Sequence, residues 1–142
     1  MLARFSDLLA DAVSRRAAVG AFTCYNLEQA AGVLRAADAR RAGVVVLVSE
    51  KSFAGADGPL LLSALVAAAE QSGARACVQL DHVSDFALIE SAFALGAGAV
   101  LADGCSARGR LREQLREPDQ HQAAPLAVPP SGRVALPRVR LQ

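Results

Sequence analysis

The sequence predicts an α/β fold built around a parallel sheet, and three observations support this prediction. Four short apolar runs alternate with stretches of helical periodicity, and the runs start roughly 25 to 30 residues apart, which is typical of consecutive βα units. Residues 44–48 are apolar at every position, as expected for a parallel strand that is buried on both faces. Each run also ends at a polar residue. Because hydrophobic residues make up 53% of the chain, there is ample material for a core.

The spacing of apolar residues predicts helices over residues 3–16, 27–41, about 60–72 and about 84–95. Asn26 is the expected N-cap of the second helix, because its side chain can accept a hydrogen bond from the first turn. We expect Gly43, Gly73 and Gly96 to end the second, third and fourth helices in turn. The region around Gly55 and Pro59 is expected to be a loop.

Polar residues stand at the exit of each predicted strand. The strands are expected over residues 18–22, 44–48, 76–80 and 99–102, and their exits are Thr23-Cys24, Ser49-Glu50, Asp81-His82 and Asp103-Gly104. Periodicity alone fits both a Rossmann-like open sheet and half of a (β/α)₈ TIM barrel. No G-x-G-x-x-G follows the first strand, which disfavours a dinucleotide fold. A barrel would bring all four polar exits onto one rim, so we predict its N-terminal half, followed by an irregular C-terminal tail.

Asp81 and His82 carry the most chemical information. In parallel α/β folds the reactive groups collect where strands leave the sheet. There an Asp can transfer a proton, and a His can bind a metal or act as a second base. The alternative is that Asp81 N-caps the next helix and that His82 is an ordinary surface residue.

The composition divides the chain into two parts. Residues 1–104 carry 8 Lys and Arg against 11 Asp and Glu, whereas residues 105–142 carry 7 against 3. We therefore expect one folded part over residues 1–106 and a basic tail rich in Pro, Arg and Ala over residues 107–142, mostly disordered, with a short helical turn near residues 110–117. A net charge of +1 and the lack of aromatic residues in the tail argue against a nucleic-acid partner.

The expected location is the cytoplasm. No uninterrupted apolar stretch is long enough to span a membrane, so no membrane partner is expected. The three cysteines, Cys24, Cys77 and Cys105, lie far apart and are odd in number, which favours reduced thiols over a disulfide framework.

Taken together, these motifs resemble the class II (metal-dependent) ketose-bisphosphate aldolases, the fructose- and tagatose-bisphosphate aldolase family. The likeness covers residues 1–106, and the matching segments are Val19-Gly20-Ala21-Phe22, Asn26-Leu27-Glu28-Gln29, Val48-Ser49-Glu50, Leu80-Asp81-His82 and Ala102-Asp103-Gly104. The Asp-His pair after the third strand is the most specific of them. The resemblance implies a lyase of carbohydrate metabolism and glycolysis, with a phosphorylated sugar as substrate.

The resemblance also implies a role for four residues. His82 would be one of three histidine ligands of a catalytic Zn²⁺, and Asp81 would be the acid/base that exchanges a proton with the aldehyde-derived hydroxyl. Asp103 would bind metal near a second cation site, and Ser49 would lie near the substrate phosphate. In such a reaction zinc polarises the ketone so that an enediolate can form, and a nearby carboxylate moves the proton. The alternatives are helix caps for Asp81 and Asp103, and loop hydrogen bonding for Ser49.

The chain departs from the family pattern in several places. Thr23 and Val83 stand where the family has Asn and Gly, and the only other histidine, His121, lies in no family motif. A catalytic zinc needs three protein ligands, and the motifs supply one. The composition change after Gly104 leads us to expect a truncated or frame-shifted product that is inactive alone. A non-catalytic half-barrel interaction module, pairing as a homo-oligomer, is the alternative, and the choice between fructose and tagatose substrates stays open.

Overall fold

The computed structural model describes residues 1–103, which form one α/β unit. Its elements in chain order are α1 (Phe5–Ser14), β1 (Gly20–Thr23), α2 (Leu27–Ala39), β2 (Val44–Ser49), α3 (Glu50–Phe53), α4 (Gly58–Gln71), β3 (Ala76–Val83), α5 (Phe86–Ala94) and β4 (Ala99–Ala102). The part predicted to be a disordered tail lies outside the described residues. Within residues 1–103, no helix has both the length and the apolar character needed to cross a membrane.

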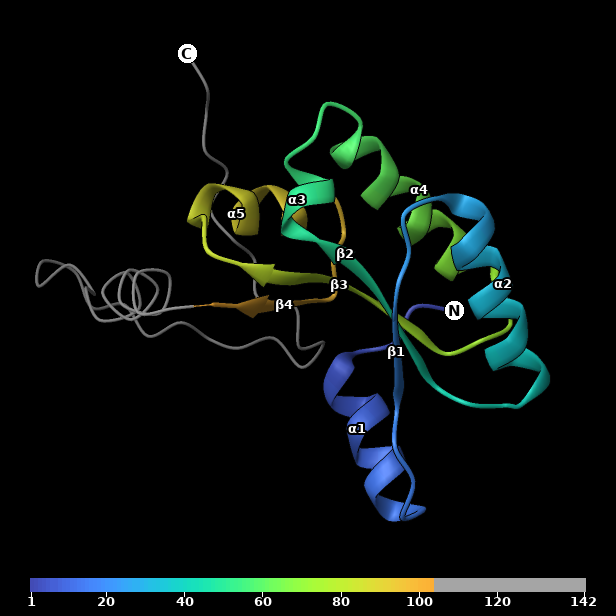
Figure 1. The fold of residues 1–142 in the computed structure, drawn as a ribbon. Coiled ribbons are helices and arrows are strands. Elements are labelled where there is room, and N and C mark those ends of the chain that lie inside the picture. The colour runs from blue at the N-terminus through green and yellow to red at the C-terminus, as the bar shows by residue number, and fades with distance from the viewer. Residues whose placement is uncertain (104–142) are drawn as a thin grey trace, which may run out of the picture.

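The four strands form one parallel sheet in the order β1-β2-β3-β4 (Figure 1). Each strand therefore pairs with the next one along the chain. A doubly wound sheet would reverse direction at a switch point, whereas sequential order with intervening helices is the arrangement of a (β/α)₈ barrel. The predicted α/β fold with about four parallel strands is confirmed.

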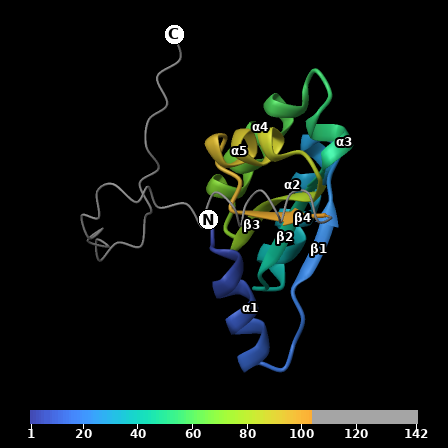
Figure 2. The ribbon, with the colours of Figure 1, turned by 90° about the vertical axis from the view of Figure 1, so that its left-hand side faces the viewer.

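The two faces of the sheet are covered differently. Alternate strand residues, among them Val46, Val78 and Leu80, pack with α2, α4 and α5 in the larger hydrophobic core. On the opposite face, Leu8 of α1 packs on Val45 and Cys77 in a smaller core. Figures 1 and 2 show α1 alone at one end of the sheet, apart from the other helices. The face under α1 is therefore covered near the strand starts, and we call it the inner face.

The helix ends differ in part from those expected. Asn26 N-caps α2 as predicted, since its side chain accepts a hydrogen bond from the N–H of Gln29. Gly96, with φ +97°, follows α5 in the left-handed conformation that favours glycine. The expectation that Gly43 ends α2 is wrong, because the helix stops at Ala39 and Arg41 takes the left-handed position, with φ +50°.

Gly43 serves a packing role instead. A Cβ at this position would lie 2.8 Å from Cδ2 of Leu8, closer than carbon atoms pack. The missing side chain therefore lets α1 approach the start of β2. Two further features were not expected from the sequence: the short helix α3, in a region predicted to be a loop, and the continuation of β3 through Val83.

Candidate functional site

The carboxyl ends of the strands bring the predicted residues to one edge of the sheet. Ser49, the last residue of β2, lies directly opposite Asp81 of β3 in the strand register. Asp81 has the same alternation as Cys77 and Gln79, which places it on the inner face of the sheet. Asp103 directly follows β4. The sheet thus gathers Ser49, Asp81, His82 and Asp103 at its carboxyl edge, as the strand-end pattern predicted.

A β-bulge interrupts the pairing of β3 with β4 at Asp81 and His82. Leu80 pairs with Val100 and Val83 pairs with Ala102, so two residues of β3 lie opposite the single residue Leu101. Leu80 and Val83 are both fully buried in the larger core. The extra residue therefore allows Val83 to return to the helix-covered face while Asp81 and His82 both stay at the rim.

His82 accommodates the bulge with an unusual backbone conformation. Its φ is +54°, in the left-handed region that is uncommon for residues other than glycine. Such a conformation costs on the order of 1–2 kcal/mol and persists when neighbouring contacts hold it. Strained positions of this kind gather at functional sites.

A short hydrogen bond joins His82 to Asp103. The ring N–H at Nδ1 donates to Oδ2 of Asp103 over 2.7 Å. The hydrogen bond to Asp103 raises the pKa of His82, and the negative charges of Asp103 and Asp81 add to the effect. With Nδ1 engaged, Nε2 is the ring nitrogen left for a ligand. Histidines that bind metals commonly donate their other ring N–H to a carboxylate in this way.

Ser49 acts as the N-cap of α3. Its hydroxyl oxygen accepts a hydrogen bond from the N–H of Ser52 at 3.3 Å and lies 2.9 Å from Oγ of Ser52. The local hydrogen bonding considered for Ser49 is therefore present, and its role near a substrate phosphate stays a prediction.

The capping alternative for Asp81 is wrong. The side chain that caps α5 belongs to Asp85, which accepts a hydrogen bond from the N–H of Ala87 at 2.9 Å. Four residues, 82–85, lie between Asp81 and the first residue of α5. The Asp81 carboxylate is partly exposed and is not used to start the helix.

Two polar residues beside the predicted set were given no role from the sequence. Glu50 accepts hydrogen bonds from the N–H and the hydroxyl of Ser84 and from the N–H of Asp85. These bonds, led by that from the N–H of Ser84, lower the pKa of Glu50. Gln79, at 9% exposure, is a buried polar residue on the inner face, two positions before Asp81. A lone Gln in an otherwise apolar run could have signalled it.

The described residues alone do not fit a catalytic zinc. Within residues 1–103 no group of three or more His, Cys, Asp or Glu side chains is arranged to hold a metal ion, whereas such a site takes three protein ligands. His82 presents one ring nitrogen, and its neighbours Asp81 and Asp103 are carboxylates. His121, the other histidine, lies outside the described residues.

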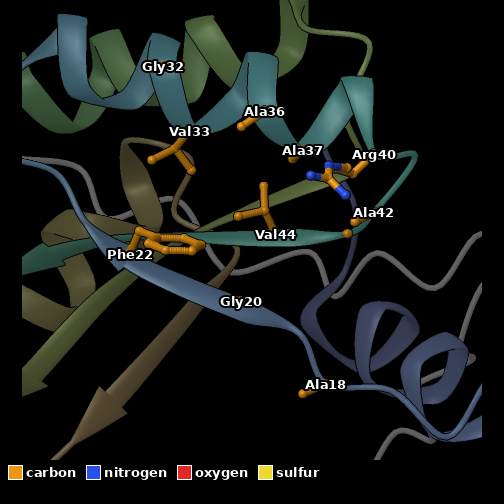
Figure 3. Close-up of a pocket in the computed structure, with 11 residues that line it drawn as sticks. Ala18, Gly20, Phe22, Gly32, Val33, Ala36, Ala37, Arg40, Ala42 and Val44 are labelled. Atoms are coloured by element: carbon orange, nitrogen blue, oxygen red, sulfur yellow. The ribbon is translucent and has the colours of Figure 1, made fainter.

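An apolar groove lies away from this site, along the edge of the sheet that β1 forms. It has a volume of about 450 Å³ and runs between α2 and the edge strand β1 (Figure 3). Figure 3 shows Val44 pointing toward α2, with the ring of Phe22 beside it and Arg40 at one end. Phe22 is 50% exposed. A groove of this composition suits packing against protein better than proton transfer.

The fold and the site define a class of protein: a (β/α) barrel unit with an Asp-His pair at the carboxyl end of its third strand. Residues 3–114 match the class-II fructose-bisphosphate aldolase family, which covers most of the chain. The chain belongs to this family. No match was found among curated proteins.

The fold resembles that of several solved structures, among them one from Escherichia coli and one from Coccidioides immitis. The X-ray crystal structure of the YdjI aldolase from Escherichia coli K12 aligns with a TM-score of 0.68 at 21% identity, over 73% of this chain and 39% of that one. A candidate fructose-1,6-biphosphate aldolase from Coccidioides immitis aligns with a TM-score of 0.64 at 24% identity, over 70% of this chain and 35% of that one. The chain thus spans well under half the length of either protein.

Proposed function

We propose that this chain is a class II aldolase homologue that carries part of the active site for reversible aldol cleavage. The substrate would be a ketose 1,6-bisphosphate, and the products would be dihydroxyacetone phosphate and an aldehyde phosphate. The observation that carries the proposal is the convergence of Asp81, His82 and Asp103 on one edge of the sheet, with His82 bonded to Asp103 at 2.7 Å. Family membership supports the reaction class.

Asp81 is the acid/base in this proposal. Its carboxylate lies on the inner face, which is where the substrate of a barrel enzyme meets the strand ends. From there it would take the proton of the hydroxyl group at the bond that breaks and return it in the reverse direction. Ser49, directly across the register, would contact a phosphate group of the substrate.

His82 would contribute one ligand, through Nε2, to Zn²⁺, and Asp103 would hold the imidazole or a second cation. The remaining zinc ligands must come from outside residues 1–103. We therefore expect the chain alone to bind zinc weakly and to show no measurable turnover. The buried, free thiols of Cys24 and Cys77 support the cytoplasm as its location.

A chimera tests the proposal. Residues 1–103 would replace the aligned part of the E. coli YdjI aldolase, with folding checked by circular dichroism and gel filtration and with zinc measured by mass spectrometry. Release of dihydroxyacetone phosphate would be followed with a coupled reporter enzyme, with and without a chelator. We expect Asp81→Asn to lower turnover by about 10²–10⁴-fold with zinc retained, and Glu90→Gln, an exposed control in α5, to leave it unchanged. Full turnover by a folded Asp81→Asn chimera would contradict the role of Asp81.

A second candidate function, a half-barrel interaction module, is favoured by the two edges of the sheet, since β1 and β4 each pair with only one strand within residues 1–103. All four residues of β1 are exposed, and the outer strands carry exposed apolar side chains, Phe22 at 50% and Leu101 at 39%. The strands are parallel and in sequential order. A second copy, related by a two-fold axis roughly parallel to the strands, could therefore pair its β4 with β1 of the first copy, and its β1 with β4 of the first copy. Unpaired edges of this kind favour such pairing.

Analytical ultracentrifugation of the full chain distinguishes this candidate. We expect a dimer that Phe22→Asp dissociates and that Leu60→Asp, an equally drastic change at an exposed site on α4, leaves intact. A monomer at all concentrations would exclude self-pairing.

A further inference from the structure

Glu50 links two strand exits at the proposed site. It is the first residue of α3, directly after β2. Its Oε1 atom lies 2.9 Å from the backbone nitrogen of Ser84, 3.0 Å from the hydroxyl of Ser84 and 3.2 Å from the backbone nitrogen of Asp85. One carboxylate oxygen therefore binds the segment that begins two residues after His82. These donors belong to positions 34 and 35 residues away in the sequence.

The other side of the same segment is bound to β4. The N–H of Asp103 donates to the carbonyl oxygen of Val83 at 2.8 Å, and the Asp103 side chain accepts from His82. The residues that follow His82 are thus bound on two sides. Val83 is bonded to Asp103 after β4, and the loop beyond it is bonded to Glu50 after β2. A residue with φ +54° needs such support, because an unsupported chain relaxes to the more populated regions of φ and ψ.

The bonds to Glu50 are the stronger kind. Hydrogen bonds to an ionised carboxylate are about twice as strong as bonds between neutral groups. They also satisfy two backbone N–H groups just before α5 that its own cap, Asp85, leaves without a partner, since Asp85 accepts from Ala87. Within residues 1–103, Glu50 is the side chain that accepts from the N–H groups of Ser84 and Asp85.

We propose that Glu50 is a positioning residue that holds the β3–α5 loop so that His82 keeps its left-handed backbone conformation and its side chain stays on Asp103. Any effect of Glu50 on catalysis rests on the proposed function. Its effect on the backbone conformation of His82 does not, because that conformation is measured without substrate or metal.

Nuclear magnetic resonance on the full, metal-free chain tests the proposal. The first two readouts are the hydrogen-exchange rates of the Ser84 and Asp85 amides. The third is the nuclear Overhauser cross-peak between Hα and HN of His82, which is strong when φ is positive because the two protons are then close together. In Glu50→Ala we expect both exchange rates to rise by at least about tenfold and the His82 cross-peak to weaken. In Glu50→Gln, which keeps an acceptor oxygen at the same place, we expect most of the protection and the cross-peak to return.

Glu90→Ala is the matched control, because it removes one exposed carboxylate from α5 without touching the loop. It should leave all three readouts unchanged. The proposal is overturned if Glu50→Ala leaves the His82 cross-peak as in the parent chain, or if Gln does not rescue it. It is also overturned if exchange rises equally in the distant helix α2, because the loss of protection would then not be centred on the loop. Absence of aldolase activity in the chimera would refute the proposed function and leave these outcomes unaffected.

Discussion

Nδ1 of His82 and Oδ2 of Asp103 lie 2.7 Å apart, although 21 positions separate the two residues in the sequence. The contact joins the exits of two neighbouring strands. It depends on the bulge, because a regular β3 would turn the His82 side chain toward the helix-covered face that Val83 now occupies. The hydrogen bond between His82 and Asp103 therefore depends on the backbone geometry of β3.

Replacing the carboxylate should change the titration of the imidazole. In the metal-free chain, Asp103 raises the pKa of His82 above its ordinary value of 6.5. Asp103→Asn should therefore lower the pKa of His82 toward that value. The pair stabilises the fold below the ordinary pKa, and the contribution is lost as the pH rises through the raised one. Imidazole resonances titrated in a His121→Gln background would report His82 alone, and an unchanged pKa would rule out the contact in solution.

Glu50 should give an acid-dependent contribution to stability. Hydrogen bonds from Ser84, backbone first and side chain second, lower its pKa below the ordinary 4.5. A lowered folded-state pKa stabilises the fold above the ordinary pKa, and this contribution disappears as the pH falls through the folded value. We therefore expect the chain to be more stable than Glu50→Gln at pH 7 and the difference to vanish in acid. Urea unfolding at a series of pH values measures this, and a difference that grows in acid would contradict it.

The larger core should be sensitive to truncation of a single side chain. Leu65 of α4 is fully buried, whereas Leu60 in the same helix is 71% exposed. Leu65→Ala should reduce the free energy of unfolding by about 2–5 kcal/mol, from lost burial and the cavity that remains. Leu60→Ala should change it by less than about 0.5 kcal/mol. Equal losses in the two variants, measured by urea unfolding, would mean that α4 does not pack on the sheet as described.

Cys77 should be unreactive in the folded chain. Its side chain is fully buried, and burial raises the pKa of its thiol to about 11, so at pH 8 it is protonated and a poor nucleophile. Iodoacetamide should label Cys77 at least about 100-fold more slowly in the native chain than in guanidinium chloride. Peptide mass spectrometry identifies the labelled cysteine. Fast native labelling of Cys77 would show that α1 leaves the inner face readily.

Local signals in the sequence predicted most of the fold but not the details of the site. Helical spacing and the apolar run at residues 44–48 were sufficient for the strands and main helices, because those patterns follow from burial on one face or two. The polar strand ends correctly placed Ser49, Asp81, His82 and Asp103 on one edge. The bulge was not predictable, since it depends on how β3 pairs with β4, and neither strand marks it with a glycine.

The same limit explains the errors. Asp85 rather than Asp81 caps α5 because the bulge lengthens the strand, and a cap cannot be assigned until the strand end is known. Gly43 was expected to end α2 because glycine often does, yet the constraint on it comes from Leu8, a contact between residues far apart in the sequence. Glu50 was visible at a strand exit, but its partners Ser84 and Asp85 lie in another loop.

The pairing of each strand with its successor has a consequence for how the chain folds. Each strand of the sheet pairs with the next one along the chain after a single helix-containing connection, so no pairing of neighbouring strands has to wait for a strand made later. During synthesis such a unit can grow strand by strand from its N-terminal side. The exception is the isolated bridge between Leu2 and Ala76, which joins the start of the chain to β3 and cannot form until β3 has been made. Residues near Leu2 are therefore among the last of the described part to reach their native contacts.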